Sequence, residues 1–198
     1  MFIALLAMIL KAEAAEPNCI IPVLVNYETV PQNMSDKFTS SLDSAIGEWN
    51  SAMDKIQIAR YPQTNKEESY GAIHVKWGDV TQNVPGGLKV ATTFVSTGIE
   101  DRVSRARITM DKDTPWCVAG SRDCFDLYEV FLHELGHSLG LLHSSEDNAV
   151  MFFNVLKEVR KPNITQSDRK AIRQLMPEND PGCDTKSGYL TWSRFNSD

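Results

Sequence analysis

The sequence predicts an α+β domain, with a twisted mixed sheet of five strands and three helices. Its segments follow one another as strand, helix, four strands and two helices, and this order implies a sheet backed by helices. With 198 residues the chain is long enough for one domain with a sizeable core. An apolar fraction of 42% and a charged fraction of 23% are typical of globular proteins.

A signal peptide is expected ahead of this fold. Residues 2–10 are all apolar, a run too short to span a membrane, and Ala12-Glu13-Ala14 matches a cleavage site, although no Lys or Arg precedes the run. We therefore expect a signal peptide over residues 1–14, a catalytic domain over 15–182 and a C-terminal tail over 183–198. The expected location is secreted, extracellular or periplasmic.

The first helix has the clearest periodicity in the chain. It is predicted over residues 35–53 with Ser35 as N-cap, because apolar residues recur at i, i+3 and i+4 spacing. The first strand is predicted over residues 20–26, with Pro22 near its start. The other four strands are predicted at residues 56–60, 72–77, 88–96 and 106–111.

Two further helices complete the domain. One begins near Asp126, whose spacing from Glu129 suits a capping box. The last runs from Thr165 to Met176, with Thr165 and Asp168 as caps. The apolar residues of the tail are expected to pack on the domain: Tyr189, Leu190, Trp192 and Phe195.

One run carries most of the functional information, His-Glu-Leu-Gly-His-Ser-Leu-Gly-Leu-Leu-His (residues 133–143). His133 and His137 are four residues apart, so on a helix they share one face and can hold one zinc. Glu134 is turned toward the open side of that metal, where its carboxylate can take a proton from water. Gly140 allows a left-handed helix end, after which His143 can return as a third ligand. Three protein ligands leave a fourth position for water, as in catalytic zinc sites.

The alternative is that these are ordinary surface residues. Two His and a Glu on a helix face are common, but the longer pattern fixes five positions. At typical residue frequencies a chain of this size contains it by chance with a probability on the order of 10⁻⁵. The zinc site is therefore the better interpretation.

The four cysteines form an even set in an exported chain, which favours disulfides. Three pairings are possible. We expect Cys117–Cys124, which brackets a short loop, and Cys19–Cys183, which brackets the whole domain. A four-cysteine metal site is the alternative, but the cysteines lack the C-x₂-C spacing typical of one.

The chain resembles the matrixins, the matrix-metalloproteinase branch of the metzincin zinc proteases, over roughly residues 20–178. Beyond the zinc motif, five features carry the resemblance. Ser144 follows the third His, and Ala149-Val150-Met151 is similar to the matrixin Met-turn. Ile164 to Asp168, followed by Ile172 to Leu175, is similar to the final helix of the family. Pro85-Gly86-Gly87-Leu88 resembles the loop before the cleft-edge strand, and Asp111 and Trp116 resemble the segment after the fifth strand.

The resemblance implies a metzincin-like fold and a secreted zinc endopeptidase. His133, His137 and His143 would be the metal ligands, Glu134 the general base and Met151 an apolar floor beneath the metal. The substrate is expected to lie extended against strand 88–96. One alternative is a secreted zinc-binding module without turnover, but such a module would not need Glu134. The other is a structural zinc domain, for which Cys19 is the candidate fourth ligand.

The chain also departs from the matrixin pattern. His74 is the one His outside the zinc motif, so we expect a single zinc, and His74 itself is expected on the surface of a strand. Calcium binding through Asp111 and Asp113 is possible. Phe152-Phe153 replaces the usual Tyr-Pro after the Met-turn, which leaves the shape of the main specificity pocket open.

The resemblance also raises the question of how such a protease would be kept inactive before use. Few residues separate the expected cleavage site from the first strand, so we expect no inhibitory prodomain; Cys19 could act as a short zinc switch if it is not in a disulfide.

A net charge of −6 without a Lys/Arg cluster argues against nucleic acid or anionic membrane as a partner. We expect protein or peptide substrates, no stable membrane anchor and a monomer.

Overall fold

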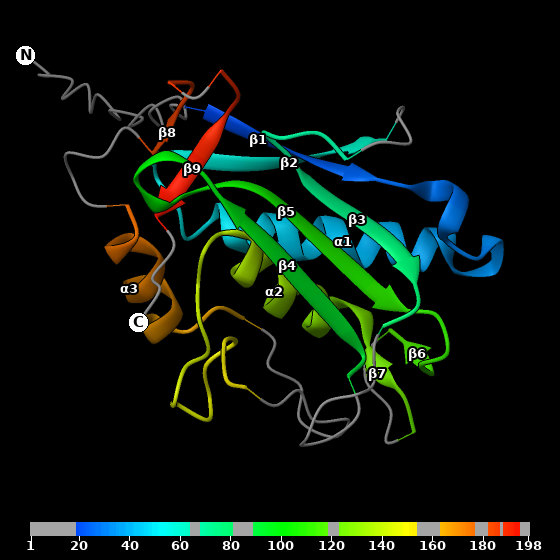
Figure 1. Ribbon diagram of the computed structural model, residues 1–198. Coiled ribbons are helices and arrows are strands. Elements are labelled where there is room, and N and C mark those ends of the chain that lie inside the picture. Colours follow the sequence, from blue (N-terminus) through cyan, green and yellow to red (C-terminus); the bar gives the residue numbers. More distant parts are fainter. Residues whose placement is uncertain are drawn as a thin grey trace, which may run out of the picture.

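A twisted sheet and a layer of helices make up the fold (Figure 1). The computed structural model describes residues 19–63, 68–80, 89–118, 123–153, 163–176, 182–186 and 188–194. The expected signal peptide, the Pro85 to Leu88 turn and Phe195 lie outside these residues. None of the helices in the described ranges is both long and apolar enough to cross a bilayer.

The main sheet has seven strands. These are β1 (Cys19–Val25), β2 (Ile56–Pro62), β3 (Ile73–Gly78), β4 (Ala91–Thr97), β5 (Arg102–Asp111), β8 (Cys183–Asp184) and β9 (Thr191–Arg194). Two short strands, β6 (Trp116–Cys117) and β7 (Phe125–Asp126), form a second sheet before the zinc-motif helix.

Strand direction changes once in the first five strands. β1 lies between β2 and β3 and is parallel to both, and β3 is parallel to β5. β4 is antiparallel to β5 and pairs with no other described strand; its outer edge, which carries no described strand, is called the open edge. Val103 of β5 pairs with Thr97 of β4 and with Trp192 of β9. A strand has two edges, and β4 occupies one edge of β5. β9 and β3 therefore share the other edge, with β9 beside residues 102–103 of β5 and β3 beside residues 106–111.

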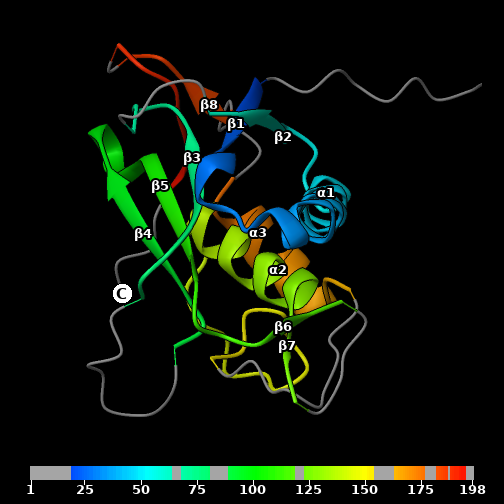
Figure 2. The same ribbon diagram turned by 90° about the vertical axis from the view of Figure 1, so that its right-hand side faces the viewer.

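Two helices cover one face of the sheet, α1 (Ser35–Asn50) and α2 (Leu127–Ser138), as Figure 2 shows. The buried residues of α1 recur at helical spacing and include Phe38 and Trp49. Phe38 meets Phe131 of α2 edge-on at a centroid distance of 4.9 Å, and the Trp49 indole donates to the Leu132 carbonyl at 2.8 Å. These contacts fix α2 against α1. The third helix, α3 (Gln166–Gln174), lies near the end of α2 that leads to His143.

The predicted mixed α+β fold with three helices is confirmed, and the five predicted strands are present. The tail adds β8 and β9, which are too short to show a hydrophobic period.

The prediction of Ser35 as N-cap is wrong. A 3₁₀ turn, Gln32–Met34, runs directly into α1, so Met34 is the capping residue and Ser35 is already helical. Thr165 and Asp168 do form the predicted capping box of α3.

The prediction of His74 as a surface residue is wrong. Its side chain is buried. β3 is an interior strand, and described residues of the segment between β2 and β3 lie next to His74. In that segment the Ser69 carbonyl is 2.9 Å from His74 Nε2, and Gln63 Oε1 is 3.5 Å from Nδ1.

Candidate metal centre and active site

Local contacts determine where α2 begins. The Asp126 carboxylate accepts hydrogen bonds from the backbone N–H groups of Tyr128 at 2.9 Å and Glu129 at 3.3 Å. It thereby satisfies two of the free donors of the first helical turn. The Cys117–Cys124 disulfide closes the preceding loop, with its Cα atoms 5.7 Å apart.

The other end of α2 is a Schellman turn. Gly140 has a φ of 101°, in the left-handed region that favours glycine. Its N–H donates to the His137 carbonyl at 2.9 Å, and the Leu141 N–H donates to the Gly136 carbonyl at 3.0 Å. These two bonds define the motif. The turn reverses the chain and brings His143 back toward the helix, as the sequence predicts.

The three histidines converge on one point. His137 Nε2 lies 3.1 Å from His133 Nε2 and 3.2 Å from His143 Nε2. Nitrogens bound to a tetrahedral zinc at 2.0–2.1 Å lie about 3.3 Å from one another. In the described part of the chain, this is the one group of three or more His, Cys, Asp or Glu side chains arranged to hold a metal. The donor set and its spacing therefore fit zinc.

Backbone carbonyls orient two of these imidazoles. The Val150 carbonyl is 2.8 Å from His133 Nδ1, and the Leu141 carbonyl is 2.8 Å from His137 Nδ1. A carbonyl can only accept, so each Nδ1 carries the proton and each Nε2 presents its lone pair to the centre. Burial lowers the pKa of His137 and of His143. Lowered pKa values keep the imidazoles neutral, the form that binds metal.

The Met-turn packs against α2 beside the histidines. Met151 is buried against Gly136 of α2, where an added Cβ would overlap Met151 Sδ and come within 2.9 Å of Trp49 Cζ2. The Asp168 carboxylate accepts from the Val150 N–H at 3.0 Å and the Met151 N–H at 3.2 Å. The sequence predicts Asp168 only as a helix cap. Its hydrogen bonds to the Met-turn join residues 17 and 18 positions apart, and no sequence pattern indicates them.

Glu134 lies beside the histidines, and its pKa is shifted. Burial raises the pKa of its carboxyl to about 7, although the hydrogen bond from Thr93 and the charge of Lys89 lower it. The Thr93 hydroxyl donates to Glu134 Oε2 at 2.5 Å. Thr93 comes from β4, 41 residues away in sequence. No pattern in the sequence predicts the role of Thr93, because only the packing of β4 against α2 brings Thr93 and Glu134 together.

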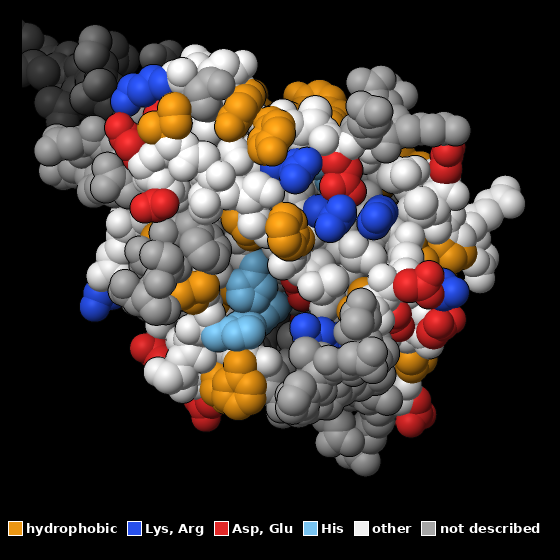
Figure 3. All heavy atoms as spheres, viewed as in Figure 1, with side chains coloured by type: hydrophobic (Ala, Val, Ile, Leu, Met, Phe, Trp, Pro, Cys, Tyr) orange, Lys and Arg blue, Asp and Glu red, His pale blue; other side chains and the backbone are white. Residues whose placement is uncertain are grey.

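These groups share a cleft of about 290 Å³. Figure 3 shows the histidine side chains at the floor of a hollow on this face of the molecule. One wall is the start of β4 and another is Phe153, which is 64% exposed. The lining residues are Lys89, Val90, Ala91, Thr92, Thr93, Val130, His133, Glu134, His137, His143 and Phe153.

The remaining predicted residues lie elsewhere. Cys19 is paired with Cys183, with Cα atoms 6.2 Å apart, and does not line the cleft. The Asp111 carboxylate is buried and accepts from the Thr114 hydroxyl at 2.8 Å, whereas Asp113 is exposed. Calcium binding there stays a prediction.

The sequence profile of the matrixin family matches residues 23–176 of this chain. The chain belongs to the matrixin family. It is 30% identical to Metalloendoproteinase 1 of Glycine max over 166 residues, which cover 76% of this chain and 50% of that protein. It is 52% identical to Interstitial collagenase A of Mus musculus over 65 residues, which cover 33% of this chain and 14% of that protein.

A third relative is Metalloendoproteinase 2-MMP of Arabidopsis thaliana, 36% identical over 77 residues that cover 35% of this chain and 20% of that protein. The chain therefore spans half or less of the length of these relatives. In this matrixin, two aromatic rings follow the Met-turn, with the Phe152 and Phe153 centroids 4.5 Å apart. Of the two, Phe153 lines the cleft and supplies an apolar wall to it.

Proposed function

We propose that this matrixin is a secreted zinc-dependent endopeptidase in which Glu134 acts as the general base. One observation carries the proposal. A buried carboxylate with a raised pKa lies in the same cleft as three converging imidazole Nε2 atoms and an open strand edge. A metal site, a base and a surface for an extended peptide are the parts that peptide hydrolysis requires.

His133, His137 and His143 would hold the zinc. When bound, zinc supplies a Lewis acid that acidifies water and polarises a carbonyl oxygen. Both orienting carbonyls act through Nδ1, so the Nε2 atoms stay available to the metal without a change of tautomer. One zinc per chain is expected from these ligands.

Glu134 would transfer the proton. The Thr93 hydroxyl occupies Oε2, which leaves Oε1 to accept a proton from the attacking water and pass it to the leaving amine. Burial raises the pKa of this carboxyl, which favours its uptake of a proton inside the cleft. Thr93 holds the carboxylate in place between the two transfers.

The open edge of β4 would bind the substrate. An extended peptide added to this edge gains backbone hydrogen bonds, and its side chains alternate between the two faces of the sheet. Since Val90 to Thr93 line the cleft, the bound peptide would pass beside the three histidines. Phe153 would offer an apolar surface to a substrate side chain on the opposite wall.

Secretion is part of the proposal. Both cysteine pairs are disulfides in the structure, and disulfides persist in oxidising compartments. An apolar run followed by a small-residue cleavage site at the N-terminus supports the same location.

The test compares Glu134→Gln with the wild-type chain on casein, with and without a chelator. We expect wild type to hold close to one zinc by elemental analysis and to cleave casein until the metal is removed. Glu134→Gln should keep the zinc and lose about 10²- to 10⁴-fold in activity, the usual contribution of a general base.

Glu146→Gln is the matched control. Glu146 is exposed and outside the cleft, so the same loss of one negative charge should leave activity unchanged. Near-normal turnover in Glu134→Gln would refute the role of Glu134. A wild-type chain that holds zinc but cleaves nothing would instead indicate a binding module.

A further inference from the structure

The end of α2 leaves two carbonyl groups that the Schellman turn does not use. The turn satisfies the carbonyls of Gly136 and His137. The next two belong to Ser138 and Leu139, and both residues are fully buried. A buried carbonyl without a partner costs about 1–3 kcal/mol, and water has no access here. These two groups therefore need donors from elsewhere in the chain.

The tail supplies both donors. The Trp192 indole Nε1 donates to the Ser138 carbonyl at 2.9 Å, and the Ser193 hydroxyl donates to the Leu139 carbonyl. Trp192 and Ser193 are themselves fully buried. Both lie on β9, 54 residues beyond their acceptors and outside residues 23–176, the part that matches the matrixin profile.

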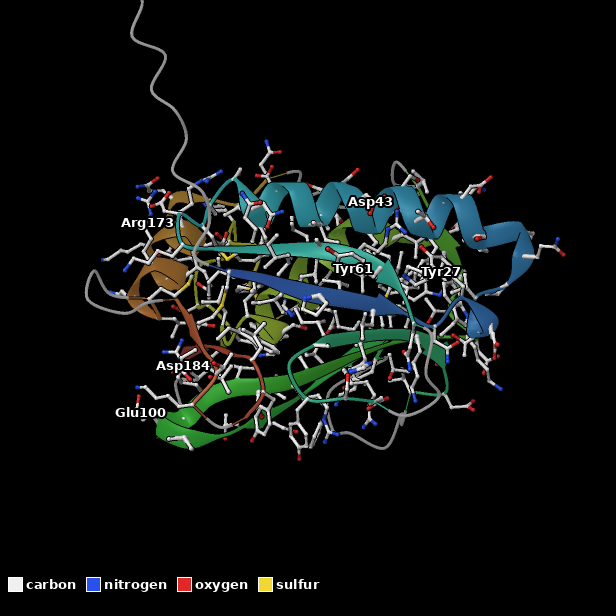
Figure 4. The ribbon with its side chains drawn as sticks, turned by 90° about the horizontal axis from the view of Figure 1, so that it is seen from above. Tyr27, Asp43, Tyr61, Glu100, Arg173 and Asp184 are labelled. Atoms are coloured by element: carbon white, nitrogen blue, oxygen red, sulfur yellow. A yellow bond between two sulfur atoms is a disulfide. The ribbon has the colours of Figure 1, made fainter. Side chains whose placement is uncertain are left out.

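The tail is fixed at several points, so these donors are held in position. β9 pairs with the start of β5, and the Cys19–Cys183 disulfide ties β8 to β1. The buried Arg102 side chain donates to the Gly182 carbonyl at 2.7 Å and lies 3.4 Å from Asp184 Oδ2. Figure 4 shows Asp184 beside the turn between β4 and β5, where Glu100 lies.

A short path connects the tail to the metal ligands. Ser138 and Leu139 directly precede Gly140 and Leu141. The Leu141 carbonyl orients the imidazole of His137, and two residues later the chain reaches His143. A shift of the helix end would therefore move both ligands.

We propose that Trp192 and Ser193 are positioning residues of the metal centre, and that the tail is part of the scaffold that sets the geometry of His137 and His143. This inference rests on the proposed zinc site. Neither residue lines the cleft, and both act through the carbonyls at the end of α2.

Ser193→Ala in the full chain is the direct test. It removes one hydroxyl and leaves the Leu139 carbonyl buried without that donor. Groups that directly orient metal ligands change affinity by about 10- to 100-fold when removed, and Ser193 acts one step farther out. We therefore expect zinc affinity, measured by chelator competition, to fall by about 3- to 10-fold. The d–d spectrum of the Co²⁺-substituted protein should change as well, and Ser193→Thr should restore both.

Thr191→Val is the matched control. Thr191 lies on the same strand and is equally buried, but its hydroxyl bonds to Asp184 Oδ1 at 3.1 Å, within the tail itself. This variant should lower the melting temperature of the zinc-free protein about as much as Ser193→Ala does, with unchanged zinc affinity and Co²⁺ spectrum.

Equal zinc affinity in Ser193→Ala and wild type would overturn the inference, and so would an equal loss in both variants, since either result means a purely structural role. Should Ser193→Ala fail to fold, Trp192→Phe tests the same path through the Ser138 carbonyl with the same measurements. A wild-type chain that binds no zinc would instead refute the proposed function.

Discussion

The two ends of the zinc helix are held by different parts of the chain. At its beginning, the cap Asp126 is adjacent to the helix, and the Cys117–Cys124 disulfide joins cysteines only 7 positions apart. At its end, the Schellman turn is local, but the last two carbonyls take their donors from β9. That strand belongs to a segment tied down by the Cys19–Cys183 disulfide, which spans 164 positions.

This difference matters because the metal ligands are not centred on the helix. His137 is one residue from its end, and His143 lies beyond it. Contacts at the beginning decide whether α2 forms, whereas contacts at the end also decide where two ligands lie. Changes at the beginning should therefore cost stability alone, and changes at the end should cost both stability and zinc affinity.

Removal of the two disulfides should give the largest contrast. In the chain-entropy model, the long Cys19–Cys183 loop stabilises the fold by about 5 kcal/mol and the short Cys117–Cys124 loop by about 2.5 kcal/mol. We expect Cys19→Ser with Cys183→Ser to lower the free energy of unfolding by the larger amount and to weaken zinc binding. Cys117→Ser with Cys124→Ser should lower the free energy of unfolding only.

Urea unfolding and chelator competition measure the two quantities. Because domains are stable by only about 5–15 kcal/mol, the first variant is best unfolded in excess zinc, which adds about 4 kcal/mol at 1,000 times the dissociation constant. A larger loss of zinc affinity in the Cys117/Cys124 variant would reverse the comparison between the two ends.

Gly140→Ala should have the next largest effect. A side chain at the left-handed Gly140 costs about 1–2 kcal/mol, and relief of that strain would move the turn that orients His137. We expect lower stability together with weaker zinc binding. Gly47→Ala is the matched control, because Gly47 is helical, with nothing near its Cβ position. There the same substitution should stabilise the protein by about 0.5–1 kcal/mol. Loss of stability in Gly140→Ala without any change in zinc affinity would uncouple the turn from the ligands.

Much of the fold could be predicted from the sequence, because its longer elements bury one face. The stripe of α1 from Phe38 to Trp49 predicts that helix, since five apolar positions share one side. The zinc run could be predicted for the same reason, since a spacing of four residues on a helix determines a shared face. The signals at both ends of α2, Asp126 and Gly140, are also local, and the structure confirms them.

The contacts between distant segments could not be predicted in this way. β8 has two residues and β9 has four, too few to show a period. Thr93 is near Glu134, and Trp192 near Ser138, only because β4 and β9 contact α2, which is distant from both strands in the sequence. His74 follows the alternation of an exposed strand residue, but its buried side chain contacts Gln63 and Ser69 from the segment between β2 and β3.

The smallest expected effect is at the beginning of α2. Asp126→Ala removes the acceptor for the N–H groups of Tyr128 and Glu129, and loss of such a cap costs about 1 kcal/mol. Asp126→Asn keeps an oxygen acceptor and should recover most of that loss. Zinc affinity should stay at the wild-type value in both variants, because His133 follows almost two helical turns later and its imidazole is oriented by Val150, not by the cap. Thermal unfolding of the zinc-free chain and chelator competition test the two statements separately. A several-fold loss of zinc affinity in Asp126→Ala would mean that the beginning of the helix also positions the ligands, and the contrast between its two ends would be lost.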